Sequence, residues 1–566
     1  MSYLDVPRLH FAGSFIAKPS TINNTPTNYD PAQLNAPGGL ALAWNPNGNH
    51  DWEFLDCTVR TAVTGDGTVW NAGKPESIIG AGVESRGRSP HNAKLVDLDT
   101  EQQMVSQIWG LRINVAVSET EYFVGNFRVM SFDDIWARVP DGQQDWMFSA
   151  YYQSFLDDVT WGDDIGSPFL QELQSKSPDQ LSIKFVVDAY QDLYYMKNFN
   201  QGRIVGTIGP ASDDEPPNFV LGRQLRPVGP GTLNYGYALV DASRQKLLVD
   251  LGNSVPTQSD HSTNPPSQSP TGPPVDVGTL AVAIVPADGK PDILGDYDYS
   301  LDAYLATAGV QEYSLTDEQL STIADTPIGV IQTVPPVGST QPAGTLLQES
   351  PTGAYINATQ PFLRMDPGEV CAVDLYALQF GEPAPDQFIV LNFNNSAMQG
   401  QQPPPPAPPY WAVGVPASAL DFPQSVVTDS RGRATFELKA SSPGNPRQVI
   451  DGQVYGVGYS WGQDNLRDFP SDSNNFVSVL VFDSFKQEPT WENLQPIMKQ
   501  YATLYPFMDS IFMLSDPEVY RQNIEAFKRV VSLPITDPGY MPVTRDMSRD
   551  KRQALLAWLN NGAPLS

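Results

Sequence analysis

The stretch Arg112-Ile113-Asn114-Val115-Ala116-Val117-Ser118 places Ile113, Val115 and Val117 at every second position. Successive side chains of a strand point to opposite faces, so this alternation predicts a β-strand with one buried face. The sequence contains many similar short runs, namely Cys57–Val63, Leu247–Leu251, Thr279–Val285, Val370–Phe380, Phe388–Phe393, Ala434–Leu438, Gln453–Tyr459 and Phe476–Phe482. Short strands separated by Gly and Pro predict a mainly β protein with two or more β-sandwich or barrel-like domains.

The end of the chain has a different pattern, with apolar residues at helical spacing over residues 491–513. A second helix is expected to begin at Asp516, whose side chain can cap it, with Pro517 at the first helical position. A third helix is expected after Ser548 and ends at Gly562. The tail therefore predicts a small C-terminal helical module.

Two stretches rich in Pro and polar residues, Gly252–Pro274 and Gln399–Pro409, predict a linker and a stiff loop. We therefore expect an N-terminal β-rich domain over residues 1–251, a β-sandwich-like region over 275–488 that forms one or two subdomains, and a helical module over 489–566. A short helical insertion is expected near 131–174. Within it, Ser149–Asp158 and Pro168–Gln174 are each expected to form a short helix.

Composition restricts the function. The chain has 566 residues and a formal charge of −30, and such a field repels nucleic acid. No apolar run approaches the ~20 residues of a membrane span, and the N-terminus lacks the pattern of a secretory signal. The expected location is the cytoplasm. Two cysteines, Cys57 and Cys371, provide no disulfide framework, although a single bridge between them stays open.

Histidine is scarce: the chain has four, and none follows residue 261. His10 lies in a strand-like run beside Arg8, and an imidazole there could ligate haem iron or act as a base. The alternative is a histidine that is hydrogen-bonded beneath a loop. His10 is the candidate catalytic residue, and no metal site is predicted because the sequence has no CxxC or HExxH motif.

Candidate ligand-binding residues are cationic or aromatic. Arg223 and Arg226, together with Arg8, could hold an organic carboxylate, although ion pairs within the protein are the alternative. Trp136 and Trp161 lie among aspartates, and carboxylates beside aromatic rings are typical of a sugar site or an acid/base pair. A solvated acidic surface is the alternative, and the pattern favours it. The glycines of 202–209 have the wrong spacing for a dinucleotide-binding loop and predict a strand that packs closely on its neighbour.

Three segments resemble the iminophenylpyruvate dimer synthase family, the imine-coupling enzymes of violacein biosynthesis. They are Leu4–Gly13, Gly202–Pro227 and a tail that includes Tyr505–Met508, Tyr540–Asp546 and Lys551–Arg552. The resemblance implies oxidative carbon–carbon coupling of imino acids from aromatic 2-oxo acids, in haem-associated enzymes. It covers the N-terminal portion of those longer enzymes, and their ferritin-like domain has no counterpart in this sequence.

The expected function is therefore binding or oxidative coupling of an aromatic 2-oxo or imino acid. The expected partners are a small aromatic acid, a second copy of the chain, or a separate ferritin-like protein. One alternative is a structural, storage or assembly protein without catalysis, and a second is a carbohydrate-binding protein. No nucleic acid and no membrane span are expected.

Overall fold

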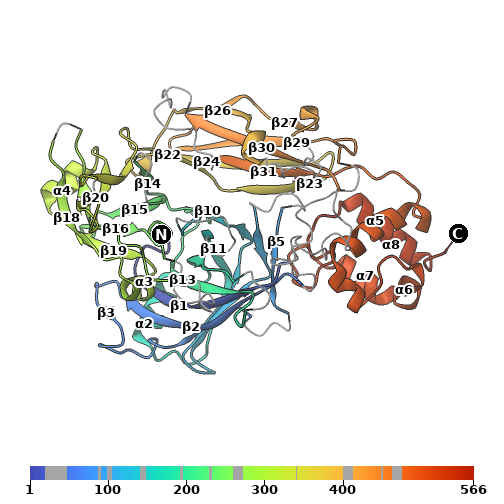
Figure 1. The fold of residues 1–566 in the computed structure, drawn as a ribbon, viewed down its shortest axis with the longest axis horizontal. Helices are drawn as coiled ribbons and strands as arrows, with labels where there is room; N and C mark the ends of the chain where they lie inside the picture. The colour runs from blue at the N-terminus through green and yellow to red at the C-terminus, as the bar shows by residue number, and fades with distance from the viewer. Residues whose placement is uncertain are drawn as a thin grey trace.

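The structure is a computed structural model that describes residues 1–19, 48–86, 91–98, 105–139, 148–191, 196–228, 233–258, 272–287, 289–339, 341–398, 412–447, 450–461 and 475–565. It is mainly β, as the alternating runs predict. A large barrel lies at the centre, a smaller rolled sheet packs beside it, a β-sandwich lies above, and helices form the C-terminal end (Figure 1).

The first unit is a closed antiparallel barrel. Among the described residues, eight strands pair in chain order, and the last pairs with the first to close the ring. They are β1 (Arg8–Ala17), β2 (Asp51–Val63), β4 (Gly82–Glu84), β7 (Arg112–Ala116), β8 (Tyr122–Phe127), β11 (Phe148–Trp161), β12 (Leu181–Asp188) and β13 (Gln201–Pro210). The short strands β3 (Val69–Trp70), β5 (Ala93–Val96), β6 (Gln107–Trp109), β9 (Met130–Ser131) and β10 (Asp133–Ala137) extend its edges.

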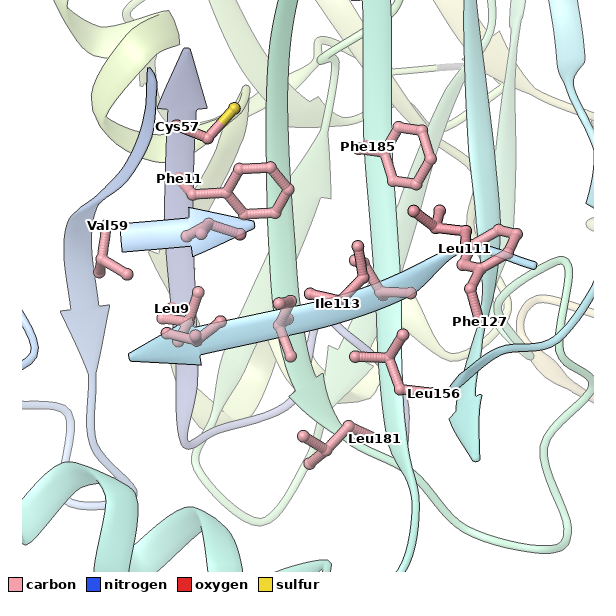
Figure 2. Close-up of a cluster of buried hydrophobic side chains, with 14 of the residues drawn as sticks. Leu9, Phe11, Cys57, Val59, Leu111, Ile113, Phe127, Leu156, Leu181 and Phe185 are labelled. Atoms are coloured by element: carbon pink, nitrogen blue, oxygen red, sulfur yellow. The ribbon is translucent and has the colours of Figure 1, made fainter. Parts of the chain in front are cut away.

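Apolar side chains fill the barrel interior. Ile113 and Val115 on β7 are fully buried, so the alternation of Arg112–Ser118 correctly indicates the inner face. In Figure 2 the side chains of Leu9 and Phe11 from β1, Leu156 from β11 and Phe185 from β12 converge on this core. The prediction for residues 202–209 is also confirmed, because a Cβ on Gly206 would lie 2.4 Å from the Phe11 ring.

One predicted helix in the 131–174 insertion is wrong. Ser149–Asp158 belongs to strand β11, whereas Pro168–Lys176 does form helix α2, capped by Ser167. The period-two pattern of β11 is hidden because both faces of the strand are buried. Tyr152 and Leu156 face the barrel core, and Tyr151 packs into a second cluster with the neighbouring sheet.

The second unit is an eight-stranded sheet, in the order β18-β17-β20-β21-β14-β15-β16-β19. Its strands are β14 (Arg223–Pro227), β15 (Gly236–Asp241), β16 (Lys246–Asp250), β17 (Thr279–Ile284), β18 (Asp292–Tyr297), β19 (Val310–Ser314), β20 (Ile328–Val334) and β21 (Thr345–Glu349). The sheet rolls up, since Tyr313 on β19 donates its hydroxyl hydrogen to the carbonyl of Asp296 on β18 at 3.2 Å. Helices α3 (Leu301–Thr307) and α4 (Asp317–Ile323) belong to this unit.

This sheet corrects the predicted domain boundary. It combines β14–β16 with β17–β21, so a division between residues 251 and 275 would cut through it. The expected linker begins with a buried segment, in which Asn253, Ser254 and Val255 are all less than 5 % exposed. Residues 259–271, and the predicted loop Gln399–Pro409, lie outside the described residues. A polar segment can be buried here because its carbonyls and side chains bind the barrel.

Buried charges join the barrel to this sheet. Lys184 on β12 lies 2.7 Å from Asp250 Oδ2, and Tyr3 donates a hydrogen bond to the same oxygen at 2.6 Å. The ammonium also lies 4.2 Å from the centroid of the Tyr151 ring. Because burying a charge without a partner is costly, these contacts fix how the two units meet.

The third unit is a sandwich of two five-stranded sheets with one shared core. One sheet contains β22 (Ala354–Ala358), β24 (Val370–Gln379), β25 (Glu382–Pro383), β27 (Leu420–Asp421) and β29 (Arg433–Ala440). The other contains β23 (Phe362–Met365), β26 (Phe388–Phe393), β28 (Ser425–Val427), β30 (Gln453–Trp461) and β31 (Phe476–Val481). Two 3-10 turns, Asn395–Met398 and Ala417–Ala419, belong to this unit.

The C-terminal unit is helical, as expected, with α5 (Trp491–Leu504), a 3-10 turn (Pro506–Ser510), α6 (Pro517–Gln522), α7 (Ile524–Ser532) and α8 (Arg549–Asn560). The Asp516 side chain caps α6 as predicted, and Ser548 caps α8. No helix in the described ranges has the length and apolar character needed to cross a bilayer. Cys57 and Cys371 are both free thiols, so the bridge left open by the sequence is not formed.

Candidate functional site

A pocket of about 250 Å³ lies at one mouth of the barrel. Neighbouring strands of an antiparallel barrel run in opposite directions, so the end of β1, the start of β2, the start of β11 and the end of β12 all meet at this mouth. Phe15, Trp52, Tyr152 and Val187 come from these four strand ends and line the pocket. Barrels of eight strands are wide enough to hold side chains or one small ligand, and their mouths are common ligand sites.

Aromatic rings form the apolar wall of the pocket. Phe15 stacks on Trp52 with ring centroids 4.8 Å apart, and on Tyr190 at 6.2 Å. Tyr152 lies 6.0 Å from Trp52 and meets Phe132 edge-on at 6.1 Å. The Tyr190 hydroxyl lies 2.9 Å from both Ala17 O and Asn200 Oδ1, to one of which it donates its hydrogen, and this holds the ring in place. The wall is therefore rigid and suited to a flat ring.

The polar edge of the pocket includes Ser149 and Asp188. Asp188 forms two hydrogen bonds with Arg203, at 2.8 and 2.9 Å, and a third with Arg138 at 2.6 Å. Burial alone raises the pKa of Asp188, but the two guanidinium groups outweigh it and hold the pKa below its usual value. The carboxylate is therefore charged at neutral pH, and two arginines lie behind it.

Tyr152 and Asp188 each keep one protonation state at neutral pH. Burial raises the pKa of Tyr152 well above its usual value, so its hydroxyl keeps its hydrogen at neutral pH. Asp188 is held by its arginine partners. In the described part of the chain, no three His, Cys, Asp or Glu side chains gather to hold a metal ion. A cavity of about 150 Å³ accepts benzene, so this larger pocket has room for a bicyclic ring.

His10 lies far from this chemistry, on the outer face of β1. It is 1 % exposed, and its Nδ1 lies 2.9 Å from Thr207 Oγ1. It does not line the barrel-mouth pocket. Arg8 beside it binds Glu312 at 2.7 Å and the carbonyl of Leu4 at 2.8 Å. This close packing does not fit haem ligation by His10, and it matches the alternative of a hydrogen-bonded buried histidine.

The burial of His10 predicts a pH effect on stability. Burial, and secondarily the charge of Arg8, lower its pKa well below the usual value, so the folded protein keeps His10 neutral. The unfolded chain binds a proton near pH 6.5, so stability falls as pH drops below about 6.5, by up to ~1.4 kcal/mol per pH unit. Urea unfolding at several pH values should show that His10→Asn loses less stability than the wild type as the pH falls. The control is His91→Asn at an exposed position, and equal losses in both variants would contradict this role.

The two other candidate arginines also serve the fold. Arg223 is 2 % exposed, lies 3.1 Å from Glu349 and donates to the carbonyl of Phe380 at 3.0 Å, which ties the second sheet to the sandwich. Arg226 donates to Gln224 at 3.0 Å on the same strand. The structure does not bring either of them to the barrel mouth.

The two candidate tryptophans lie at different ends of the barrel. Trp136 pairs with Ser149 in the β10–β11 ladder, and its indole donates to Asn253, so it lies beside the barrel-mouth pocket without lining it. Trp161 lies at the opposite end of β11, against Phe123 at 5.3 Å, and its indole donates to Pro178 O at 2.6 Å. The two rings therefore do not form a common platform.

Four residues that line the pocket were not among the candidates predicted from the sequence, namely Phe15, Trp52, Asp188 and Tyr190. A weak signal exists in the sequence: Phe11 and Phe15 are four residues apart on β1, which places two rings on one strand face. The pocket can be located only when the order in which the strands close into a barrel is known. That order brings residues 15, 52, 152 and 188 together although they are far apart in the chain.

Comparisons with known proteins identify no relative by sequence. No protein-family model and no curated protein matches the chain. The chain is similar to the D0-D1 domain of Intimin, with 10 % identity over 41 % of this chain and 87 % of that one, at a TM-score of 0.15.

It is also similar to S-layer protein SbsC, domains 1–6, with 9 % identity over 67 % of this chain and 46 % of that one, at a TM-score of 0.15. A third structure is the S-layer protein rSbsC(31-844), with 8 % identity over 77 % and 53 % of the two chains and a TM-score of 0.15. The chain spans about half the length of these two S-layer chains. Scores this low support no inference about fold or function.

Proposed function

We propose that the barrel binds a small planar aromatic molecule of the aromatic 2-oxo acid class at its mouth. The observation that carries this proposal is the stacked wall of Phe15, Trp52 and Tyr190 around a pocket of about 250 Å³. Offset and edge-to-face aromatic contacts add about 0.5–1.5 kcal/mol per ring pair beyond the area that they bury.

The polar edge supports a ligand with a carboxylate. Arg138 bridges two residues of the pocket wall, donating to Asp188 at 2.6 Å and to Ser149 Oγ at 3.5 Å. With Arg203, the cluster has two guanidinium groups for one carboxylate. Neither arginine lines the pocket, because both lie behind Asp188. The ring of the ligand would lie against the aromatic wall, and its carboxylate would lie away from Asp188, attracted by the net positive charge of the cluster.

Titration calorimetry with phenylpyruvate, indole-3-acetate and neutral indole-3-acetamide tests the proposal. We expect both acids to bind with 1:1 stoichiometry, and the amide to bind more weakly. Equal affinities would show that the carboxylate is not recognised, and absence of binding by all three would overturn the proposal.

A blocking variant locates the binding. Ala150 lines the pocket and is 4 % exposed, so Ala150→Phe should fill the space and reduce affinity more than tenfold. Trp161→Phe, at the other end of the barrel, is the matched control and should bind like the wild type. Circular dichroism checks that both variants are folded. Unchanged binding by Ala150→Phe would place the ligand elsewhere.

A further inference from the structure

A second cavity, of about 340 Å³, lies where the helical module meets the edge of the barrel. The helical module supplies most of its wall, from helices α5, α7 and α8 and from the segments 505–514 and 541–547. Residues 48–50 and Lys94 of the barrel supply the rest. Four methionines contribute to the wall, Met498, Met508, Met541 and Met547. Methionine side chains are flexible and polarizable, so such a wall adapts to apolar molecules of varied shape.

The barrel side supplies the polar part of this cavity. His50 is 3 % exposed, and its ring meets Tyr505 edge-on with centroids 5.8 Å apart. His50 Nδ1 lies 2.9 Å from the carbonyl oxygen of Leu95. A carbonyl can only accept, so Nδ1 carries the hydrogen of this bond.

The other ring nitrogen of His50 is then a bare acceptor. Burial, as the largest cause, lowers the pKa of His50 to about 4, so the ring is neutral at pH 7 and Nε2 has a lone pair. Nε2 is buried and has no hydrogen-bond partner among the residues that the structure describes. A buried polar atom without a partner costs about 1–3 kcal/mol, which a hydrogen-bond donor on a ligand would offset.

The nearby lysine does not compete for this role. Lys94 Nζ binds Asp51 Oδ1 at 2.6 Å and the carbonyl of Asn49 at 3.1 Å, so an ion pair already balances its charge. The cavity therefore has apolar walls and no unbalanced charge at its polar corner. It needs one donor, which favours an alcohol over a carboxylate.

We propose that this cavity binds an apolar molecule that carries one hydroxyl group, with the hydroxyl donating its hydrogen to Nε2 of His50. This site is separate from the barrel-mouth pocket, and neither proposal depends on the other. Binding would also hold the helical module against the barrel, because both contribute to the wall.

Two ligands of matched size test the hydrogen bond on the full chain. 1-Octanol has a hydroxyl, and 1-methoxyheptane has the same number of heavy atoms without a donor. We expect calorimetry to show roughly fivefold tighter binding of 1-octanol, as a net hydrogen bond of about 1 kcal/mol implies. Equal affinities, or no binding of 1-octanol, would overturn the proposal.

His50→Asn is the variant that isolates Nε2. Position 50 has a φ of 63°, a left-handed conformation that Asn adopts readily, and the Asn amide can replace Nδ1–H as donor to Leu95. The variant should fold and bind 1-octanol and 1-methoxyheptane with equal affinity. Octanoate, which has no hydroxyl hydrogen to donate at neutral pH, should bind the wild type and the variant with equal affinity. A preference for 1-octanol that survives in His50→Asn would refute the role of Nε2.

A second pair of variants places the ligand in the cavity. Ala526 on α7 lines the cavity and is exposed, so Ala526→Trp should fold and block entry. Its neighbour Glu525 has a side chain that is 85 % exposed, so Glu525→Trp adds the same ring without filling the cavity. We expect at least a tenfold loss of 1-octanol affinity in Ala526→Trp only. Equal affinity in both variants would contradict the site.

Discussion

Replacing Asp188 by Asn should destabilise the barrel by about 3–5 kcal/mol, because it leaves Arg138 and Arg203 buried without their counter-charge. Asp188 is 2 % exposed and binds both arginines, as well as the hydroxyl of Tyr304 at 3.3 Å. These contacts link β12 and β13 of the barrel to helix α3 of the second unit. Asp188→Asn keeps the shape of the side chain and removes its charge, so it should destabilise the interface between the barrel and the second unit.

The matched control for this experiment is a solvent-exposed pair on the same barrel. Arg128 and Asp157 lie 2.8 Å apart, but their side chains are 44 % and 28 % exposed. Asp157→Asn should therefore cost less than about 1 kcal/mol. Hydrogen exchange of β12 and β13 peptides in urea measures the barrel by itself in a multidomain chain. If Asp188→Asn and Asp157→Asn destabilise the barrel by similar amounts, burial of the Asp188 cluster does not increase its contribution to stability.

Phe185→Ala should destabilise the barrel by a similar amount, about 3–5 kcal/mol, through a cavity in its core. Phe185 is fully buried and lies 5.3 Å from Tyr152 and 6.3 Å from Trp52, both in stacked geometry. It also meets Phe54 edge-on at 5.6 Å. Because two of these rings line the barrel-mouth pocket, the loss of Phe185 should weaken aromatic-ligand binding as well.

Two further variants separate size from position. Phe185→Leu keeps most of the volume and should cost less than about 2 kcal/mol. Phe388→Ala removes a phenyl ring that is 43 % exposed on the sandwich, so its effect should stay within about 0.5 kcal/mol. Urea unfolding gives the stability, and calorimetry with indole-3-acetate gives the affinity. If Phe185→Ala unfolds like Phe388→Ala, the barrel core does not depend on this ring cluster.

The position of the candidate site could not be predicted from the sequence. The aromatic acid was an expectation from the family resemblance and stays a proposal. The pocket itself is lined by Phe15, Trp52 and Tyr190, which were not among the candidate residues. Arg8, Arg223 and His10 are buried and bonded within the fold. A cation in a run of alternating residues can face a ligand or a neighbouring sheet, and the sequence does not distinguish these two cases.

The sequence by itself determined the strands and the helical tail, because these depend on local periodicity and on caps such as Asp516 and Ser548. It misassigned β11, whose two buried faces remove the alternation. Only the tertiary structure decided that β1 pairs with β13, that residues 223–349 form one sheet, and that Trp52 meets Phe15 at a barrel mouth. Pairing between distant strands depends on shape and burial across the whole molecule, and no local pattern encodes it.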